Sequence, residues 1–225
     1  MKLAILYAGP YRGTFDILKN HLNTFGDNID IYVSCFEHYL DEWKSSNWPI
    51  TEYFVTPYID FDKTNWAKNR NDAAGQSGFW QFWNLKNVID SIPKNYDFYI
   101  KNRNDIIFND KLNLKSIELL DNVLYSPNES FHRKDWDTNT WLNDEFYIGC
   151  ERTMRVISKF VTDYYNKNSH HLNTPNASNE SQLRIHLNQN NINVSKLYNF
   201  SYSKNHYGVT SPSGLVKFQL ENYKK

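Results

Sequence analysis

The sequence has 225 residues, enough for one well-buried core and within the range that α/β proteins fill as a single domain. Lys and Arg together number 25, as do Asp and Glu, so the net charge is zero and no long-range field favours nucleic acid or an anionic membrane. The longest apolar run, Leu3 to Ala8, is far shorter than the roughly 20 residues of a membrane span, and no signal-peptide cleavage site follows it. We therefore expect no transmembrane segment and no nucleic-acid partner.

Cysteine and aromatic residues are the informative parts of the composition. Cys35 and Cys150 are the only cysteines, so we expect no disulfide framework, and a reducing cytoplasm is the natural compartment. The 7 Trp, 16 Tyr and 14 Phe residues make up 16% of the chain. Most of them are expected in the core, although such an excess also suits a protein that stacks sugar rings or a nucleobase.

The first part of the chain alternates between strands and a helix. The continuous apolar run from Lys2 to Tyr7 is typical of a strand buried on both faces of a parallel sheet. Thr14 to Phe25 carries apolar residues at helical spacing and stops at Gly26, which predicts a helix. Two more strands are predicted over Ile29–Ser34 and Tyr53–Thr56. This order indicates a doubly wound α/β sheet.

The middle of the chain contains a long polar and irregular stretch, from Phe61 to Gly78, and such stretches are usually functional or mobile. Phe79 to Ile92 then predicts an amphipathic helix that Pro93 ends, and Tyr96 to Lys101 predicts a strand. Residues 106–108 are apolar again but receive no assignment of their own. The remaining predicted elements are strands at 123–125, 146–148 and 194–197 and helices at 151–165 and 179–187, with loops at 128–142 and 168–178 and no assignment for 199–225.

Arg103, Asn104 and Asp105 follow the predicted strand that ends at Lys101. In open α/β sheets, ligands bind outside the carboxyl ends of the strands. A guanidinium fork suits phosphate oxygens, and a carboxylate suits a divalent ion that bridges them, so this strand end could hold a nucleotide diphosphate. The alternative is a polar turn with an internal Arg–Asp pair, and the residues alone do not decide between the two.

Two other segments are candidates for chemistry. Gly9 and Gly13 flank Arg12 between the first strand and the first helix, where glycines permit close backbone approach and a helix start favours anions. The segment is neither a dinucleotide fingerprint nor a Walker loop, and Arg12 could equally be a solvated loop charge. Asp144 and Glu145 precede the strand 146–148 and are candidates for acceptor binding and general-base catalysis, or simply exposed acids at a strand start.

The order of these motifs resembles a family of GT-A glycosyltransferases. The motifs are A-G-x-x-R at residues 8–12, then "YDFYIKNRNDIIF", "NDEFYIG", the helix start "ERTM", and "NESQLRIHL". The family includes WavE-like lipopolysaccharide-synthesis proteins and glycosyltransferases of large algal viruses. The resemblance spans roughly Lys2 to Val194. It implies a single GT-A domain over residues 1–225, Rossmann-like, with a mixed, mostly parallel central sheet flanked by helices.

The resemblance also implies roles for the donor-side residues. Gly9 and Arg12 would contact the nucleotide, and Arg103 and Asp105 would hold the diphosphate and its metal ion, Mn²⁺ or Mg²⁺. Arg103 stands where a D-x-D enzyme has its first acid, so only one carboxylate of the motif is left for the metal. We expect His206, in the C-terminal segment, to be the second metal ligand. The alternative is a weak cation site in which Arg103 substitutes for part of the metal ion.

Asp144 or Glu145 would face the acceptor hydroxyl, and Asp72 and Gln81 are further candidates for donor contacts. The implied function is transfer of a sugar from a nucleotide-sugar donor, expected to be UDP-linked, to a hydroxyl of a glycan acceptor. The expected location is the cytoplasm, which would be the host cytoplasm for a viral protein. Two other functions stay open: a non-catalytic glycan-binding module on the same fold, and a sugar nucleotidyltransferase.

Overall fold

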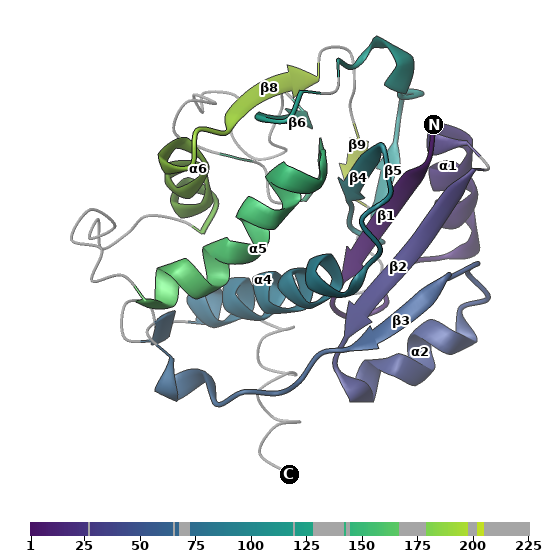
Figure 1. Cartoon of the computed structure of the whole chain (residues 1–225). Helices are drawn as coiled ribbons and strands as arrows, with labels where there is room; N and C mark the ends of the chain where they lie inside the picture. The colour runs from purple at the N-terminus through teal and green to yellow at the C-terminus, as the bar shows by residue number, and fades with distance from the viewer. Residues whose placement is uncertain are drawn as a thin grey trace.

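The computed structural model of the chain describes residues 1–26, 28–64, 66–67, 73–118, 120–127, 142, 145–166, 179–197 and 202–204. Its centre is a seven-stranded sheet with the strand order β3-β2-β1-β4-β7-β6-β8 (Figure 1). The strands are β1 (Leu3–Ala8), β2 (Ile29–Cys35), β3 (Glu52–Val55), β4 (Phe98–Lys101), β6 (Val123–Pro127), β7 (Tyr147–Gly149) and β8 (Asn193–Leu197). A second, two-stranded sheet pairs β5 (Ile106–Phe108) with β9 (Tyr202–Lys204).

Most neighbouring strands of the large sheet are parallel. β1 pairs with β2 and β4, β2 with β3, and β6 with β8 in parallel, whereas β7 runs antiparallel to both β4 and β6. β1 lies inside this sheet, and its residues Leu3 to Tyr7 are all buried, as its continuous apolar run predicts. The structure therefore confirms an α/β fold with a mixed, mostly parallel sheet.

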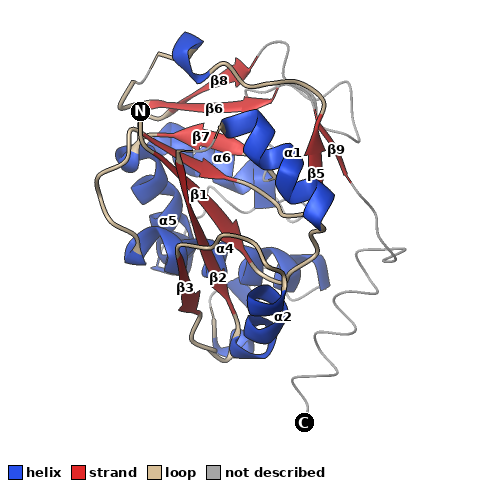
Figure 2. Cartoon of the chain, turned by 90° about the vertical axis from the view of Figure 1, so that its right-hand side faces the viewer, coloured by secondary structure: helices blue, strands red, loops and turns tan. Residues whose placement is uncertain are grey.

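Helices cover both faces of the sheet. They are α1 (Phe15–Phe25), α2 (Leu40–Ser45), α4 (Ala73–Ser91), α5 (Glu151–Asn166) and α6 (Asn179–Gln189). α4 and α5 lie side by side across one face, and α1 and α2 lie on the other (Figures 1 and 2). Short 3-10 helices are found at Glu37–Tyr39, Phe61–Lys63 and Leu114–Ser116. Among the described residues, no helix is both long and apolar enough to cross a membrane.

The strand order changes direction at β1. From β1 the chain passes to β2 and then β3 on one side, and α4 then carries it back to β4 on the other side of β1. The two strands end together, since Leu6 near the end of β1 pairs with Lys101 at the end of β4. Such a switch point leaves a crevice outside the carboxyl ends of the strands, where ligands bind in open α/β sheets.

The predicted element positions are correct for most of the seven-stranded sheet and differ from the structure elsewhere. α4 begins at Ala73, so the helix includes part of the stretch that was expected to be irregular up to Gly78. α2 and both strands of the two-stranded sheet, β5 and β9, were not predicted. Most of the expected loop 128–142 and the whole of the expected loop 168–178 lie outside the described residues.

Candidate functional site

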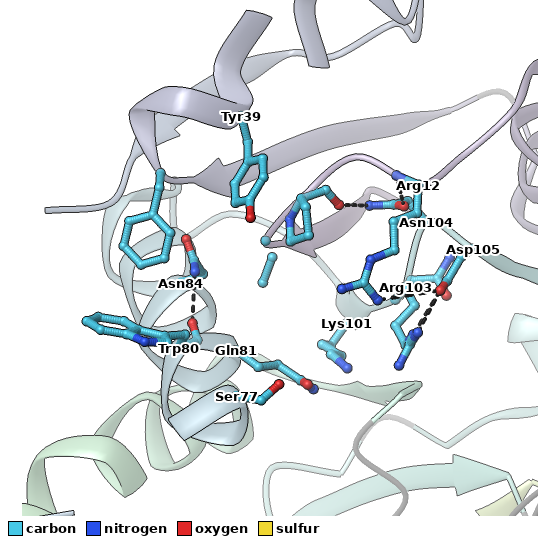
Figure 3. Close-up of a pocket in the computed structure, with 15 residues that line it drawn as sticks. Arg12, Tyr39, Ser77, Trp80, Gln81, Asn84, Lys101, Arg103, Asn104 and Asp105 are labelled. Carbon is cyan, nitrogen blue, oxygen red and sulfur yellow. Dashed lines mark hydrogen bonds and ion pairs between the residues drawn. The ribbon is translucent and has the colours of Figure 1, made fainter. Parts of the chain in front are cut away.

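A pocket lies outside the carboxyl ends of β1 and β4, at the switch point of the sheet (Figure 3). Besides the two strand ends, three parts of the chain line it: the loop from β1 to α1, the segment after β2, and residues 77–84 of α4. The lining residues are Ala8, Gly9, Pro10, Arg12, Phe36, Tyr39, Ser77, Trp80, Gln81, Asn84, Lys101, Asn102, Arg103, Asn104 and Asp105.

The loop that leaves β1 is fixed at Gly9. Its φ of +103° lies in a region that glycine adopts readily and other residues avoid. The Gly9 N–H donates to the carbonyl of Ser34 at 2.8 Å, and the Gly9 carbonyl accepts from the indole N–H of Trp43 at 2.9 Å. Both bonds hold the start of the loop that carries Pro10 and Arg12 into the pocket wall.

Asn104 ties the end of β4 to this loop. Its Oδ1 accepts from the backbone N–H of Arg12 at 2.8 Å, and its Nδ2 donates to the carbonyl of Pro10 at 3.0 Å. The backbones also approach closely, because a Cβ atom at Gly13 would come within 2.9 Å of the Asn104 carbonyl oxygen. Asn104 thereby sets where the Arg12 side chain starts relative to Arg103.

Arg103 and Asp105 form a bidentate ion pair at the pocket wall. The Arg103 Nε and Nη2 atoms donate to Asp105 Oδ1 and Oδ2 at 2.8 and 2.6 Å. Arg12 Nη1 lies 3.7 Å from Asp105 Oδ2, and Arg103 Nη1 lies 3.7 Å from Glu145 Oε1. The internal Arg–Asp pair that the sequence left as an alternative is thus present, and it lines the pocket.

Positive charge exceeds negative charge along this wall. The described lining residues include three cations, Arg12, Lys101 and Arg103, and one carboxylate, Asp105. Lys101 is only 2% exposed, and its ammonium group lies 5.6 Å from the centre of the Tyr147 ring. Burial lowers the pKa of Arg12, and the nearby Arg103 cation lowers it further, while Asp105 acts in the opposite direction. An anion in the pocket would relieve this repulsion.

The opposite side of the pocket is aromatic. Phe36 and Trp80 meet edge to face with ring centroids 5.2 Å apart, and Trp80 also stacks on Tyr58 at 5.4 Å. Figure 3 shows Tyr39 and Trp80 on the side of the pocket away from Arg12 and Arg103, with Gln81 between Trp80 and Lys101. Flat rings at one side and cations at the other form a site with two chemically different ends.

A buried polar chain supports the pocket floor. Asn102 is 1% exposed, and its Nδ2 lies 3.5 Å from the Tyr7 hydroxyl, which bonds to His21 Nδ1 at 2.7 Å. His21 Nε2 lies 2.8 Å from the Ile106 carbonyl, which can only accept, so Nε2 carries the proton and Nδ1 accepts from Tyr7. Burial lowers the pKa of His21 to about 4, so the ring is neutral at pH 7.

The structure brings together most of the predicted site residues that it describes. Gly9, Arg12, Gln81, Arg103 and Asp105 line one pocket. Glu145 is 8% exposed and contacts Arg103, but it is not among the lining residues. The roles assigned to these residues remain predictions. Asp72, Asp144 and His206 lie outside the described residues.

Several lining residues were missed from the sequence. Lys101 was read only as the last residue of a strand, although its position at the carboxyl end of β4 is a signal for a ligand contact. Asn104 was grouped with Arg103 and Asp105 without a role of its own. The aromatic residues Tyr39 and Trp80 come from segments far apart in the chain, and no local pattern joins them.

The described residues around Asp105 do not fit the expected Mn²⁺ or Mg²⁺, and the expected second ligand His206 lies outside the described part of the chain. Both carboxylate oxygens of Asp105 accept hydrogen bonds from Arg103. Elsewhere in the described ranges, no three His, Cys, Asp or Glu side chains gather as they would around a metal ion. A cation with oxygen ligands would have to displace a bidentate guanidinium to reach Asp105.

Comparison with known proteins identifies similar folds and does not identify a family or a function. No protein family and no curated protein matches the sequence. Among solved structures, the apo form of the glycosyltransferase GlyE of Streptococcus pneumoniae TIGR4 is similar, with a TM-score of 0.50 at 13% sequence identity over 87% of this chain. The match covers 45% of GlyE, so this chain spans less than half of the length of that protein. The fold of the chain is therefore similar to that of part of a glycosyltransferase.

A second GlyE structure matches with a TM-score of 0.46 at 12% identity, over 88% of this chain and 45% of that one. The 4-diphosphocytidyl-2C-methyl-D-erythritol synthase of Anaerococcus prevotii matches over 100% of this chain and 96% of its own, with a TM-score of 0.45 at 9% identity. Both values are too low to carry an argument about fold or function.

Proposed function

We propose that this protein is a glycosyltransferase that moves a sugar from a nucleotide-sugar donor to a hydroxyl group of a glycan acceptor. The observation that carries the proposal is the pocket at the switch point, with aromatic rings on one side and three cations on the other. A nucleotide sugar has matching parts, since a nucleobase or sugar stacks on aromatic rings and a diphosphate attracts guanidinium groups. The resemblance to WavE-like and algal-virus glycosyltransferases adds support.

The cationic wall favours a donor enzyme over a glycan-binding module. A module that only stacks neutral sugars gains nothing from three cations in its binding pocket, because removing a charge from water costs free energy unless a counter-charge compensates for it. The diphosphate of a nucleotide sugar provides that balance. We propose a UDP-linked donor by analogy with the fold alone.

The proposed reaction is direct displacement at the anomeric carbon. Arg12 and Arg103 stabilise the charge that develops on the leaving diphosphate, and Asn104 keeps the backbone of Arg12 in position. In an inverting reaction, Asp144 removes the proton of the acceptor hydroxyl. A retaining reaction needs no such base. None of these steps depends on the expected Mn²⁺ or Mg²⁺, which stays a prediction.

A thermal-shift panel tests the function. UDP, GDP, CMP and nucleoside triphosphates are each added with and without Mn²⁺, and we expect a diphosphate nucleotide to raise the melting temperature most. A ligand at 100 times its Kd stabilises the folded state by about 2.7 kcal/mol, which such a scan detects. Stabilisation by triphosphates alone would indicate a nucleotidyltransferase. No response to any nucleotide would contradict the proposal and leave the glycan-binding module.

A further inference from the structure

The carboxylate expected to bind a metal ion is already engaged by cations. Arg103 bonds both oxygens of Asp105 at 2.8 and 2.6 Å, and Arg12 lies 3.7 Å from one of them. Glu145, the other described carboxylate at this wall, lies 3.7 Å from Arg103. Both acids are thus arranged to hold a guanidinium group, and neither presents a bare carboxylate towards the pocket.

The charges of the wall also suit a diphosphate as they stand. Among the described residues of this wall, the three cations Arg12, Lys101 and Arg103 outnumber the lining carboxylate Asp105, and they still outnumber the carboxylates when Glu145 is added. Both phosphates of a nucleotide sugar are ionised at neutral pH. The side chains therefore supply the positive charge that a divalent cation supplies in a D-x-D site.

Arg12 is the cation best placed to meet a phosphate. Its side chain is about one third exposed, and its guanidinium group forms an ion pair with Asp105 at 3.7 Å, longer than a hydrogen bond. Arg103, by contrast, uses Nε and Nη2 for Asp105. The lowered pKa of Arg12, caused first by burial and then by Arg103, is consistent with a cation that lacks a full counter-charge.

We propose that this site binds the diphosphate without a divalent metal ion, with Arg12, Lys101 and Arg103 neutralising its charge and Asp105 acting as a positioning residue that holds Arg103 in place. The inference rests on the proposed function and departs from the metal site that the sequence predicts. It assigns the main phosphate contact to Arg12, whereas Asp105 acts on diphosphate binding only through Arg103.

Isothermal titration calorimetry with UDP and GDP tests this, in buffer with EDTA and in buffer with MnCl2. For the wild-type protein we expect the same Kd in both buffers. In EDTA, Arg12→Met should weaken binding about 10- to 100-fold, the effect of losing a hydrogen bond to a charged group. Arg12→Lys keeps the charge and loses the fork, so its loss should be smaller.

Lys94→Met is the matched control for charge. Lys94 precedes β4 at the opposite end of that strand from the pocket, is 69% exposed, and makes a long surface ion pair with Glu151. Its removal should leave the nucleotide Kd unchanged. Asp105→Asn should weaken binding less than Arg12→Met in both buffers. Circular dichroism checks that each variant is folded.

Three outcomes decide the matter. Binding in EDTA that depends on Arg12 supports the inference. Binding that requires Mn²⁺ and disappears in Asp105→Asn overturns the inference and leaves the glycosyltransferase proposal intact. Absence of UDP and GDP binding in both buffers overturns both proposals, because the pocket then holds no nucleoside diphosphate.

Discussion

At the residue scale, the contacts of Glu145 help to decide which acid is the general base for the acceptor hydroxyl. Glu145 is buried next to Arg103 and is not part of the pocket lining, so its carboxylate is occupied as an ion-pair partner. A general base needs a carboxylate within reach of the acceptor hydroxyl. Asp144, which adjoins it in the sequence, is therefore the better candidate for the base.

Separate Asp144→Asn and Glu145→Gln variants test this assignment. If the enzyme inverts configuration, Asp144→Asn should lower the transfer rate roughly 10²- to 10⁴-fold while the Kd for UDP stays the same. Glu145→Gln should weaken UDP binding through Arg103 and change the rate at saturating donor far less. The measurements are transfer rate and UDP affinity. A rate loss in Glu145→Gln alone would reverse the assignment, and near-normal rates in both would indicate a retaining reaction.

At the element scale, local sequence signals were sufficient to predict helix α1 and strand β1. α1 begins after Thr14, whose hydroxyl accepts from the Ile17 N–H at 3.3 Å, and it ends at Gly26 with a φ of +90°. Both signals are visible in the sequence, and the helix was predicted to within one residue. β1 was equally clear, because a strand buried on both faces has to be apolar throughout.

The start of α4, the short helix α2 and the aromatic side of the pocket depend on tertiary contacts and could not be predicted from local sequence. The first turns of α4 read AAGQSG, a segment that has two glycines and no apolar spacing, and α4 as a whole packs against β1, β2 and α5. α2 has six residues and buries Trp43 alone, too little for a periodic pattern. The aromatic side of the pocket joins a segment after β2 to α4, and only the folded sheet brings these together. Sequence motifs therefore found the charged wall and missed the aromatic one.

The docking of α1 onto β5 depends on a neutral histidine. His21 on α1 bonds the Ile106 carbonyl of β5 and the Tyr7 hydroxyl of β1. Its pKa is lowered by burial from 6.5 to about 4, so the unfolded chain binds a proton below pH 6.5 that the folded protein does not. Stability from this group is complete above pH 6.5 and is lost as the pH falls towards 4. At pH 5 the loss is about 2 kcal/mol.

Urea unfolding of the wild type and of His21→Gln at pH 7 and pH 5 measures this effect. The variant should be less stable at pH 7, because Gln does not fill the imidazole site. Its free energy of unfolding should fall less between the two pH values, by about 2 kcal/mol, since the titrating group is gone. An equal fall in both proteins would assign the pH dependence to carboxylates instead.

At the scale of the whole molecule, the net charge and the pocket charge differ. The chain carries 25 basic and 25 acidic side chains, so no overall field attracts an anionic donor. The proposed donor would instead be attracted by the three cations that the described residues gather where β1 and β4 end. The fold brings them together, because the switch point places the loop after β1 beside the residues after β4.

The dependence of UDP binding on ionic strength distinguishes the effect of the pocket cations from that of the net charge of the protein. Salt shortens the Debye length from about 10 Å at 0.1 M to about 3 Å at 1 M, so UDP binding to the wild type should weaken steadily as NaCl rises. Arg12→Met should show a shallower dependence, because it removes a pocket cation. Lys94→Met lowers the net charge equally but leaves the pocket intact, so it should keep the wild-type slope. The measurement is the UDP Kd across a NaCl series for all three proteins. If the Kd of Lys94→Met depends less on NaCl concentration than the Kd of Arg12→Met, the pocket cations do not govern donor binding.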